Sequence, residues 1–115
     1  MANTVKPIIL TIGNDTYTLE FNRDTVMSAE RNGLTIQEVM GMSMPITTLM
    51  LLFYAAFKMH HPEMTREQTD SILIDKLNGL QHEEIQRLRE LYAAPVETLI
   101  RDESDGERKN ATISL

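Results

Sequence analysis

The feature that most restricts the fold is an apolar stretch that begins at Pro45. The residues after this proline read ITTLMLLFYAAFKM, and they are apolar around nearly the whole circumference of a helix. Proline suits the first helical position, and Pro62 is expected to end the helix. The run from Pro45 to Phe57 is well short of the roughly 20 residues that a membrane span needs. We therefore expect a central helix that other elements, or a partner, cover on all sides.

Two short segments before this stretch alternate apolar and polar residues with the period of a β-strand. Their apolar positions are Ile8, Leu10, Ile12, Tyr17, Leu19 and Phe21. A tight turn centred on Asn14 and Asp15 would pair Ile12 with Tyr17 and would place all six apolar side chains on one face. Because two strands are only marginally stable alone, we expect a hairpin over residues 8–21 that lies on an apolar surface.

Capping signals divide the rest of the chain into helices. Asn22 is a suitable N-cap for a helix that ends at Gly33, and Thr35 with Glu38 has the spacing of a capping box for a second, short helix. Thr65 with Gln68 opens a further helix, which ends at Asn78-Gly79. The last helix spans roughly residues 81–100, and Pro95 either kinks it or splits it.

The polar cluster Glu30-Arg31-Asn32-Gly33 is interpreted as a helix end and not as a chemical site. Gly33 can adopt the left-handed conformation that terminates a helix, while Arg31 and Asn32 complement the last carbonyl groups.

These elements predict a single globular domain over residues 1–101, of the mostly α, α+β class. Its N-terminal hairpin packs on a bundle of about four to five helices, which span about residues 22–101. A chain of 115 residues has the usual size of one domain. The remaining residues, 102–115, have no apolar periodicity, so we predict a disordered C-terminal tail.

Charge and composition exclude several functional classes. The chain has no cysteine, so it has no disulfide framework and no thiol nucleophile. Its net charge is −6 and its basic residues are scattered, so we expect no nucleic-acid partner. We also expect no membrane partner and no secretory signal, because no apolar segment is long enough for a span and the start lacks a secretory apolar region.

No catalytic or metal-binding motif stands out. The His60-His61 pair with Glu63 has ligand residue types but no third histidine or cysteine nearby, and His82-Glu83-Glu84 lacks the second histidine of an HExxH motif. We expect no metal, no cofactor and no enzymatic activity. The carboxylates of Glu30, Glu38, Glu83 and Glu84 fit solvated helix faces and caps, although an enzyme with carboxylates that meet only in the fold remains an alternative.

Methionines are the most informative candidates for a binding surface. Met40, Met42 and Met44 straddle a helix junction, where full burial would leave backbone groups unsatisfied. In the last helix, Tyr92, Val96 and Leu99 belong to an apolar seam that fits either the last wall of the core or an interface. These six residues are the predicted partner-binding residues.

The order of these features resembles the small tail assembly chaperones of long-tailed bacteriophages and prophages. The resemblance covers roughly residues 8–80. A hairpin ends in Leu19-Glu20-Phe21-Asn22 and a helix closes in Glu30-Arg31-Asn32-Gly33. A short capped helix and a long apolar helix that ends near His61-Pro62 then follow.

The resemblance implies that the chain binds the tape measure protein, keeps it soluble and helps recruit the tail tube protein. It also implies a location in the cytoplasm of the bacterial host, absence from the mature virion and a tendency to self-associate. The chain would then be the short form of a protein that also has a longer, frameshifted form. The main alternative is a structural virion component, such as a tail-completion or connector protein.

Overall fold

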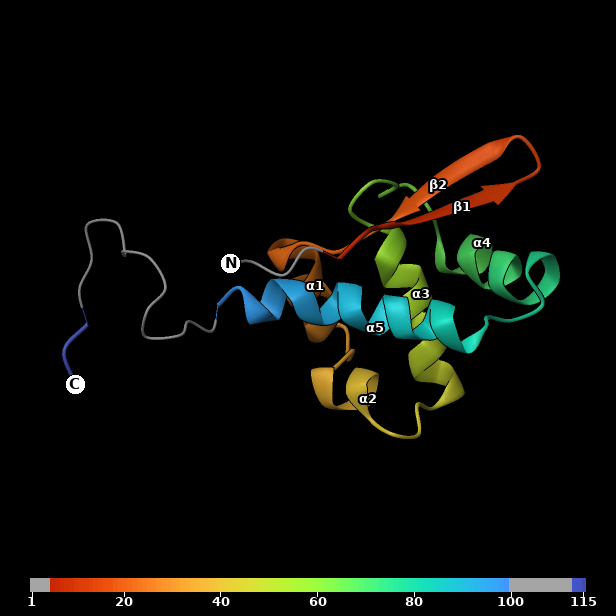
Figure 1. The fold of residues 1–115 in the computed structure, drawn as a ribbon. Coiled ribbons are helices and arrows are strands. Elements are labelled where there is room, and N and C mark those ends of the chain that lie inside the picture. The colour runs from red at the N-terminus through yellow and green to blue at the C-terminus, as the bar shows by residue number, and fades with distance from the viewer. Residues whose placement is uncertain (1–4, 100–112) are drawn as a thin grey trace.

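The computed structural model describes residues 5–99 and 113–115, which form a hairpin followed by helices (Figure 1). The strands are β1 (Ile8–Ile12) and β2 (Asp15–Leu19). The helices are α1 (Arg23–Arg31), α2 (Ile36–Met40), α3 (Ile46–Phe57), α4 (Arg66–Ser71) and α5 (His82–Glu97), with a short π-helix, η1 (Ile72–Lys76), directly after α4. This arrangement confirms the predicted mostly α, α+β class with an N-terminal hairpin.

Most of the predicted tail lies outside the described residues, as do residues 100 and 101 at the end of the predicted domain. Residues 113–115 are exposed and contain no helix or strand. No helix in the described part of the chain is long and apolar enough to cross a membrane.

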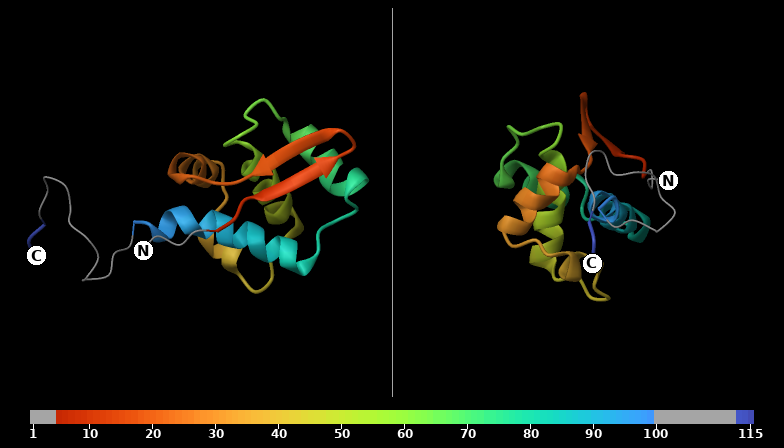
Figure 2. Two further views of the ribbon diagram at one scale, coloured as in Figure 1. Left: turned by 45° about the horizontal axis from the view of Figure 1, so that its top comes forward. Right: turned by 90° about the vertical axis from the view of Figure 1, so that its left-hand side faces the viewer.

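Helix α3 occupies the centre of the fold, as its apolar sequence predicts. It packs against α2, α4, α5 and β2, and the views in Figure 2 show the hairpin and α5 on different sides of it. Its second half is buried, with Leu52, Ala56 and Phe57 having no exposed surface. The predicted end at Pro62 is too late: the helix stops at Phe57, and the Phe57 carbonyl accepts a 2.7 Å hydrogen bond from the His61 N–H in the turn that follows.

The hairpin forms with a register that differs from the predicted one. Ile8 pairs with Leu19 and Ile12 with Asp15, so Gly13 and Asn14 form the two-residue loop. Gly13 has a φ of +60° and Asn14 does not have a positive φ, which is the pattern of a type II′ turn with glycine at its first central position. Moving the loop by one residue shifts the pairing by two, so the apolar side chains keep their common face.

Phe21 is the one apolar residue of the predicted hairpin that this register leaves outside the ladder. It is buried beyond the end of β2, with its ring 5.0 Å from the ring of Tyr92 in an edge-to-face contact. The other apolar residues of the hairpin face also pack against the core, as predicted.

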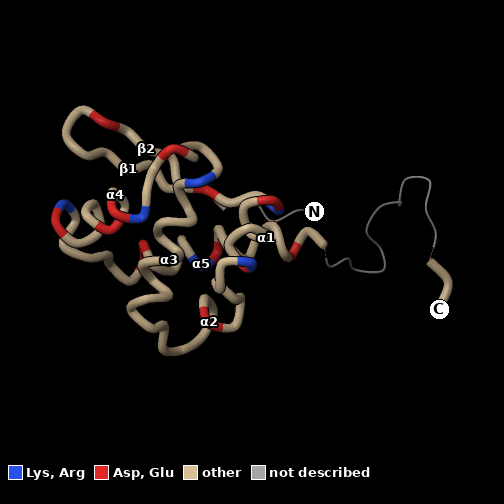
Figure 3. Tube along the Cα trace, turned by 180° about the vertical axis from the view of Figure 1, so that it is seen from behind, with Lys and Arg blue, Asp and Glu red and all other residues tan. Residues whose placement is uncertain are grey.

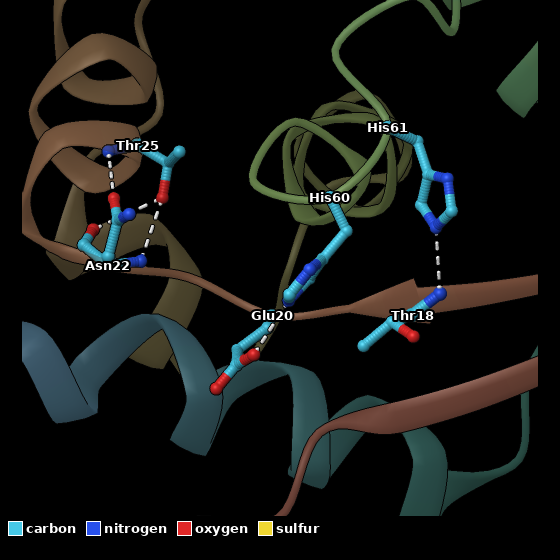
Figure 4. A network of polar contacts seen from close by, with 6 residues as sticks. All are labelled: Thr18, Glu20, Asn22, Thr25, His60 and His61. Carbon is cyan, nitrogen blue, oxygen red and sulfur yellow. Dashed lines mark hydrogen bonds and ion pairs between the residues drawn. The ribbon is translucent and has the colours of Figure 1, made fainter.

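The end of α3 and the turn that follows it lie along the outer edge of β2 and accept hydrogen bonds from two main-chain N–H groups there. The N–H of Glu20 donates to the carbonyl of Ala56 at 3.0 Å, and the N–H of Thr18 donates to Nε2 of His61 at 2.9 Å. Beside them, His60 Nε2 lies 2.8 Å from Oε1 of Glu20 (Figure 4). The adjacent histidines therefore fasten the hairpin to the end of α3.

The cluster Glu30-Arg31-Asn32-Gly33 ends α1, as predicted. Gly33 has a φ of +98°, its N–H donates to the Glu30 carbonyl, and the N–H of Leu34 donates to the Ala29 carbonyl. These two hydrogen bonds define a Schellman motif. The side chain of Asn32 adds a 2.9 Å hydrogen bond to the Ser28 carbonyl, so the last turn is satisfied locally.

The other capping predictions are confirmed with one correction. Asn22 caps α1, as Figure 4 shows, and Thr65 with Gln68 forms the full capping box of α4. Thr35 caps α2, but the carboxylate of Glu38 accepts from the Thr35 hydroxyl instead of from the Thr35 N–H. The Thr35–Glu38 pair is therefore half of the predicted box.

Two later predictions concern the ends of η1 and α5. Asn78 and Gly79 have φ values of 53° and 95°, so both left-handed residues end the helical segment at the predicted place. Pro95 does not split α5, which continues through it to Glu97. Proline has no N–H to donate within the helix, but the Thr98 N–H donates to the Ala94 carbonyl at 3.2 Å, so helical hydrogen bonding continues after it.

Candidate functional site

A groove lies between the α2–α3 connection, the start of α3 and the first half of α5. Its volume is about 540 Å³, and we call it the methionine groove. The apolar lining residues are Met42, Met44, Leu49 and Ile85, and the polar lining residues are His82, Glu83, Gln86 and Arg89. The size lies within the range of pockets that take ligands or partner side chains.

Local sequence brings the methionines to the surface at this junction. Helix α2 ends at Met40 and α3 begins just after Pro45, so the connection is too short to fold back over the core. A side chain at Gly41 would place its Cβ only 3.1 Å from the Gln37 carbonyl oxygen, which favours glycine here. The side chain of Met42 is fully exposed, whereas Met44 is half-buried and packs against the core.

The sequence segment that contains these methionines has no charged residue. No charged residue occurs from Val39 to Phe57, and Figure 3 shows the loop after α2 without red or blue segments. Charge enters the groove only from α5, through Glu83 and Arg89. The groove therefore has one apolar wall, and the opposite wall, from α5, carries one acidic and one basic residue.

Arg89 has an unusual environment for a cation. Its Nε–H is buried, and no atom of the described residues accepts a hydrogen bond from it. Its neighbour Arg87, in contrast, donates to the Lys6 carbonyl at 3.2 Å and lies 4.0 Å from a carboxylate oxygen of Glu90. A buried donor without an acceptor carries a desolvation cost that a bound acceptor would remove.

The six predicted partner-binding residues do not come together. Met42 and Met44 line the methionine groove, and Met40 lies beside it at the end of α2 with 44% of its surface exposed. Leu99 is also exposed, and Val96 is partly buried against the core. Ile85 and Val96 are separated by roughly 16 Å along α5, so the two sets lie at different ends of this helix.

Tyr92 belongs to the core in this fold. Its side chain has no exposed surface, its ring packs on Phe21, and its hydroxyl donates a 2.6 Å hydrogen bond to the Leu34 carbonyl. Tyr92 therefore presents no surface to a partner, because the seam that it belongs to faces inward at this position.

Leu49 and Arg89 are groove residues that the sequence did not single out, and Ile85 belongs to the apolar seam of the last helix but not to the six predicted partner-binding residues. Ile85 and Arg89 are four residues apart and so share one helix face, which is a signal that the sequence does contain. Leu49 carried no distinguishing signal within the long apolar run. Its place in the groove depends on where α5 crosses α3.

A second hollow, of about 380 Å³, lies between the start of α1 and the end of α5. Arg23 spans it, because Nε donates to the Thr98 hydroxyl at 2.9 Å and Nη2 to the Thr98 carbonyl at 3.2 Å. The guanidinium of Arg23 is thus already engaged within the chain. Among the described residues, none that lines this hollow has a buried side-chain donor or acceptor without a partner.

Of the residues with metal-ligand side chains, His60 and His61 serve in structural contacts. His60 and His61 contact β2, and the described residues contain no group of three or more histidine, aspartate or glutamate side chains placed to hold a metal ion.

The four candidate carboxylates each have a different position or contact in the fold. Glu38 accepts from the hydroxyls of Thr35 and Thr48, and Glu84 accepts a 2.7 Å hydrogen bond from the Gln81 N–H at the start of α5. Glu30 is exposed in the last turn of α1, and Glu83 lines the methionine groove.

Comparison with known proteins places the chain in a family. A family model described as "Domain of unknown function (DUF5055)" matches residues 1–115, the whole chain. The chain belongs to the DUF5055 family. A search of curated proteins and a search of solved structures each found no match. The description of this family names no partner and no reaction.

Proposed function

We propose that this chain is a tail assembly chaperone of a long-tailed bacteriophage or prophage. It binds the tape measure protein, keeps it soluble during assembly and helps recruit the tail tube protein. The proposal starts from the resemblance over residues 8–80, and the observation that supports it most is the exposed methionine groove.

The groove suits this role because flexible thioether side chains adapt to different apolar partners. A long helical client exposes a series of similar apolar faces, and a groove of this kind accommodates an amphipathic helix. The acidic net charge of −6 also favours solubility of the complex. In this proposal the chain acts in the host cytoplasm by binding and carries out no chemical step.

The first test is co-expression with the tape measure protein of the same phage. We expect the tape measure protein to move from the insoluble to the soluble fraction and to co-purify with the chain. An acidic protein of similar size and unrelated fold is the control for nonspecific solubilisation. Unchanged solubility together with absence of a complex would reject the proposal.

A second test separates a chaperone from a structural virion component. Mass spectrometry of purified, finished particles should detect the tail tube protein but not this chain. Detection of the chain in fixed stoichiometry would favour a tail-completion or connector protein instead.

A third test concerns recruitment of the tail tube protein. Addition of tail tube protein to the complex of this chain with the tape measure protein should give a ternary assembly in size-exclusion chromatography.

A further inference from the structure

We infer that the methionine groove binds an amphipathic helix that carries a carboxylate within its apolar face, and that Arg89 pairs with this carboxylate. The inference describes the segment of the partner that the groove binds. That this segment belongs to the tape measure protein rests on the proposed function. The binding chemistry follows from the groove itself.

The apolar wall of the groove fits the side chains of a partner helix. Met42 and Met44 come from one side, and Ile85 comes from α5 on the other. Met40 and Ile46, which lie two residues from these methionines in the chain, are also 44% and 76% exposed. A partner helix that removes this surface from water gains free energy in proportion to the apolar area that it covers.

Arg89 supplies the charge complementarity that identifies the occupant. Its Nε–H is buried and finds no acceptor among the described residues, and Arg89 lies one helical turn after Ile85 on the same face. A partner carboxylate can accept from two guanidinium N–H groups at once, which makes it a better acceptor than a neutral group. An aspartate or glutamate among apolar residues of the partner would therefore satisfy Arg89 while the apolar residues cover the methionines.

A second copy of this chain is a less suitable occupant. Each chain has a net charge of −6, which opposes association of identical chains.

The experiment is a selection with a library of helical peptides displayed on yeast. The peptides carry apolar residues at i, i+3, i+4 and i+7, and the remaining positions are randomised. With the full chain as bait, we expect aspartate or glutamate to be enriched at one position beside the apolar residues. With Arg89→Glu as bait, we expect lysine or arginine at that same position, because the charge in the groove has been reversed.

Arg87→Glu is the matched control, since Arg87 lies on the same helix but outside the groove. It should leave the acidic preference unchanged. Thermal denaturation followed by circular dichroism verifies that each bait is folded, and Arg89→Gln is the second variant if the charge reversal prevents folding. For a selected peptide, replacing its acidic residue by glutamine should weaken binding to the natural chain about tenfold and to Arg89→Gln less than about twofold.

Met42→Ser tests the apolar wall without risk to the fold, because the Met42 side chain is fully exposed. All selected peptides should bind this variant at least about threefold more weakly. Met27→Ser is its control, because Met27 is also exposed, at 47%, but lies on α1 away from the groove.

Several results would overturn the inference. Selection of no peptide, selection without an acidic preference, or an acidic preference that survives in Arg89→Glu would each do so. A chain that forms a dimer in sedimentation and becomes a monomer after Met42→Ser would assign the groove to a second copy instead.

Failure of the inference can be distinguished from failure of the proposed function by the co-expression assay. If the natural chain and Arg89→Glu solubilise the tape measure protein equally well, the groove assignment fails and the chaperone function stands. If neither does, while the library still yields acidic helices, the chaperone function fails and the binding chemistry of the groove stands.

Discussion

Tyr92 of α5 donates a hydrogen bond of 2.6 Å from its hydroxyl to the main-chain carbonyl of Leu34, 58 residues away in the sequence. Leu34 follows the glycine that ends α1, and neither side chain has exposed surface. The bond therefore joins the junction between α1 and α2 to the middle of α5. It satisfies a carbonyl that the turn itself leaves without a partner.

Replacement of Tyr92 by phenylalanine should destabilise the fold by about 1–3 kcal/mol. The ring remains to pack on Phe21, so the cost comes from the Leu34 carbonyl, which stays buried without its donor. Urea denaturation of the natural chain and of Tyr92→Phe measures the difference. Equal free energies of unfolding would show that this hydrogen bond makes no net contribution.

The stability of the fold should decrease as the pH rises above about 10. Burial, and then the negative charge of Glu30, raise the pKa of Tyr92 from 10.0 to about 12 in the folded chain. The folded state therefore holds this proton more tightly than the unfolded state does. The resulting stabilisation is complete below pH 10 and is lost between pH 10 and about 12.

Denaturation between pH 8 and 11.5 checks this pH dependence. Tyr92→Phe should show a shallower decrease over the same interval, because it lacks the titrating hydroxyl. A decrease of equal steepness in both chains would attribute the effect to other groups.

Gly33→Val should destabilise the fold by more than about 1 kcal/mol. A Cβ at Gly33 would meet no atom within 4 Å, so the cost arises from the φ of +98° and not from a clash. Gly33→Asn is the matched variant, since asparagine tolerates the left-handed conformation better, and it should lose less stability. Thermal or chemical denaturation measures both, and a valine variant as stable as the natural chain would refute the role of Gly33 as a cap.

His61→Ala should cost more stability than His60→Ala. Without His61, the N–H of Thr18 loses its acceptor, and the edge-to-face contact with Tyr17 at 5.3 Å is also lost, so we expect about 1–3 kcal/mol. His60 forms a partly exposed pair with Glu20, which is worth less than about 1 kcal/mol. Hydrogen exchange at Thr18 gives a local readout: faster exchange in His61→Ala alone is expected, and equal rates in both variants would contradict this assignment.

The elements of this fold could be predicted where one short segment contains the whole cause. Asn22, Thr65 and the pair Asn78-Gly79 act through hydrogen bonds and backbone angles within a few residues, and the structure confirms them. The hairpin register was harder, because a loop at Gly13-Asn14 and one at Asn14-Asp15 place the same apolar residues on the same face. Only the turn geometry distinguishes the two, and glycine at the first loop position decides it.

The candidate site could be predicted in part. The exposure of Met42 follows from the sequence, because a short connection with polar backbone groups stays near the surface. The opposite wall could not be predicted, since the contribution of Ile85 and Arg89 depends on how α5 crosses α3. For the same reason, the apolar seam of α5 did not show which of its residues would be covered.

The sequence by itself determined the class of fold, the order of its strands and helices and most of their caps, because local hydrogen bonds and backbone preferences control these features. The tertiary structure alone decided that Tyr92 is buried against Leu34, that His61 holds β2, and that the Nε of Arg89 lies beside the methionines with no acceptor in the described part of the chain. These outcomes depend on packing between residues far apart in the chain, which a periodic pattern of apolar residues does not specify.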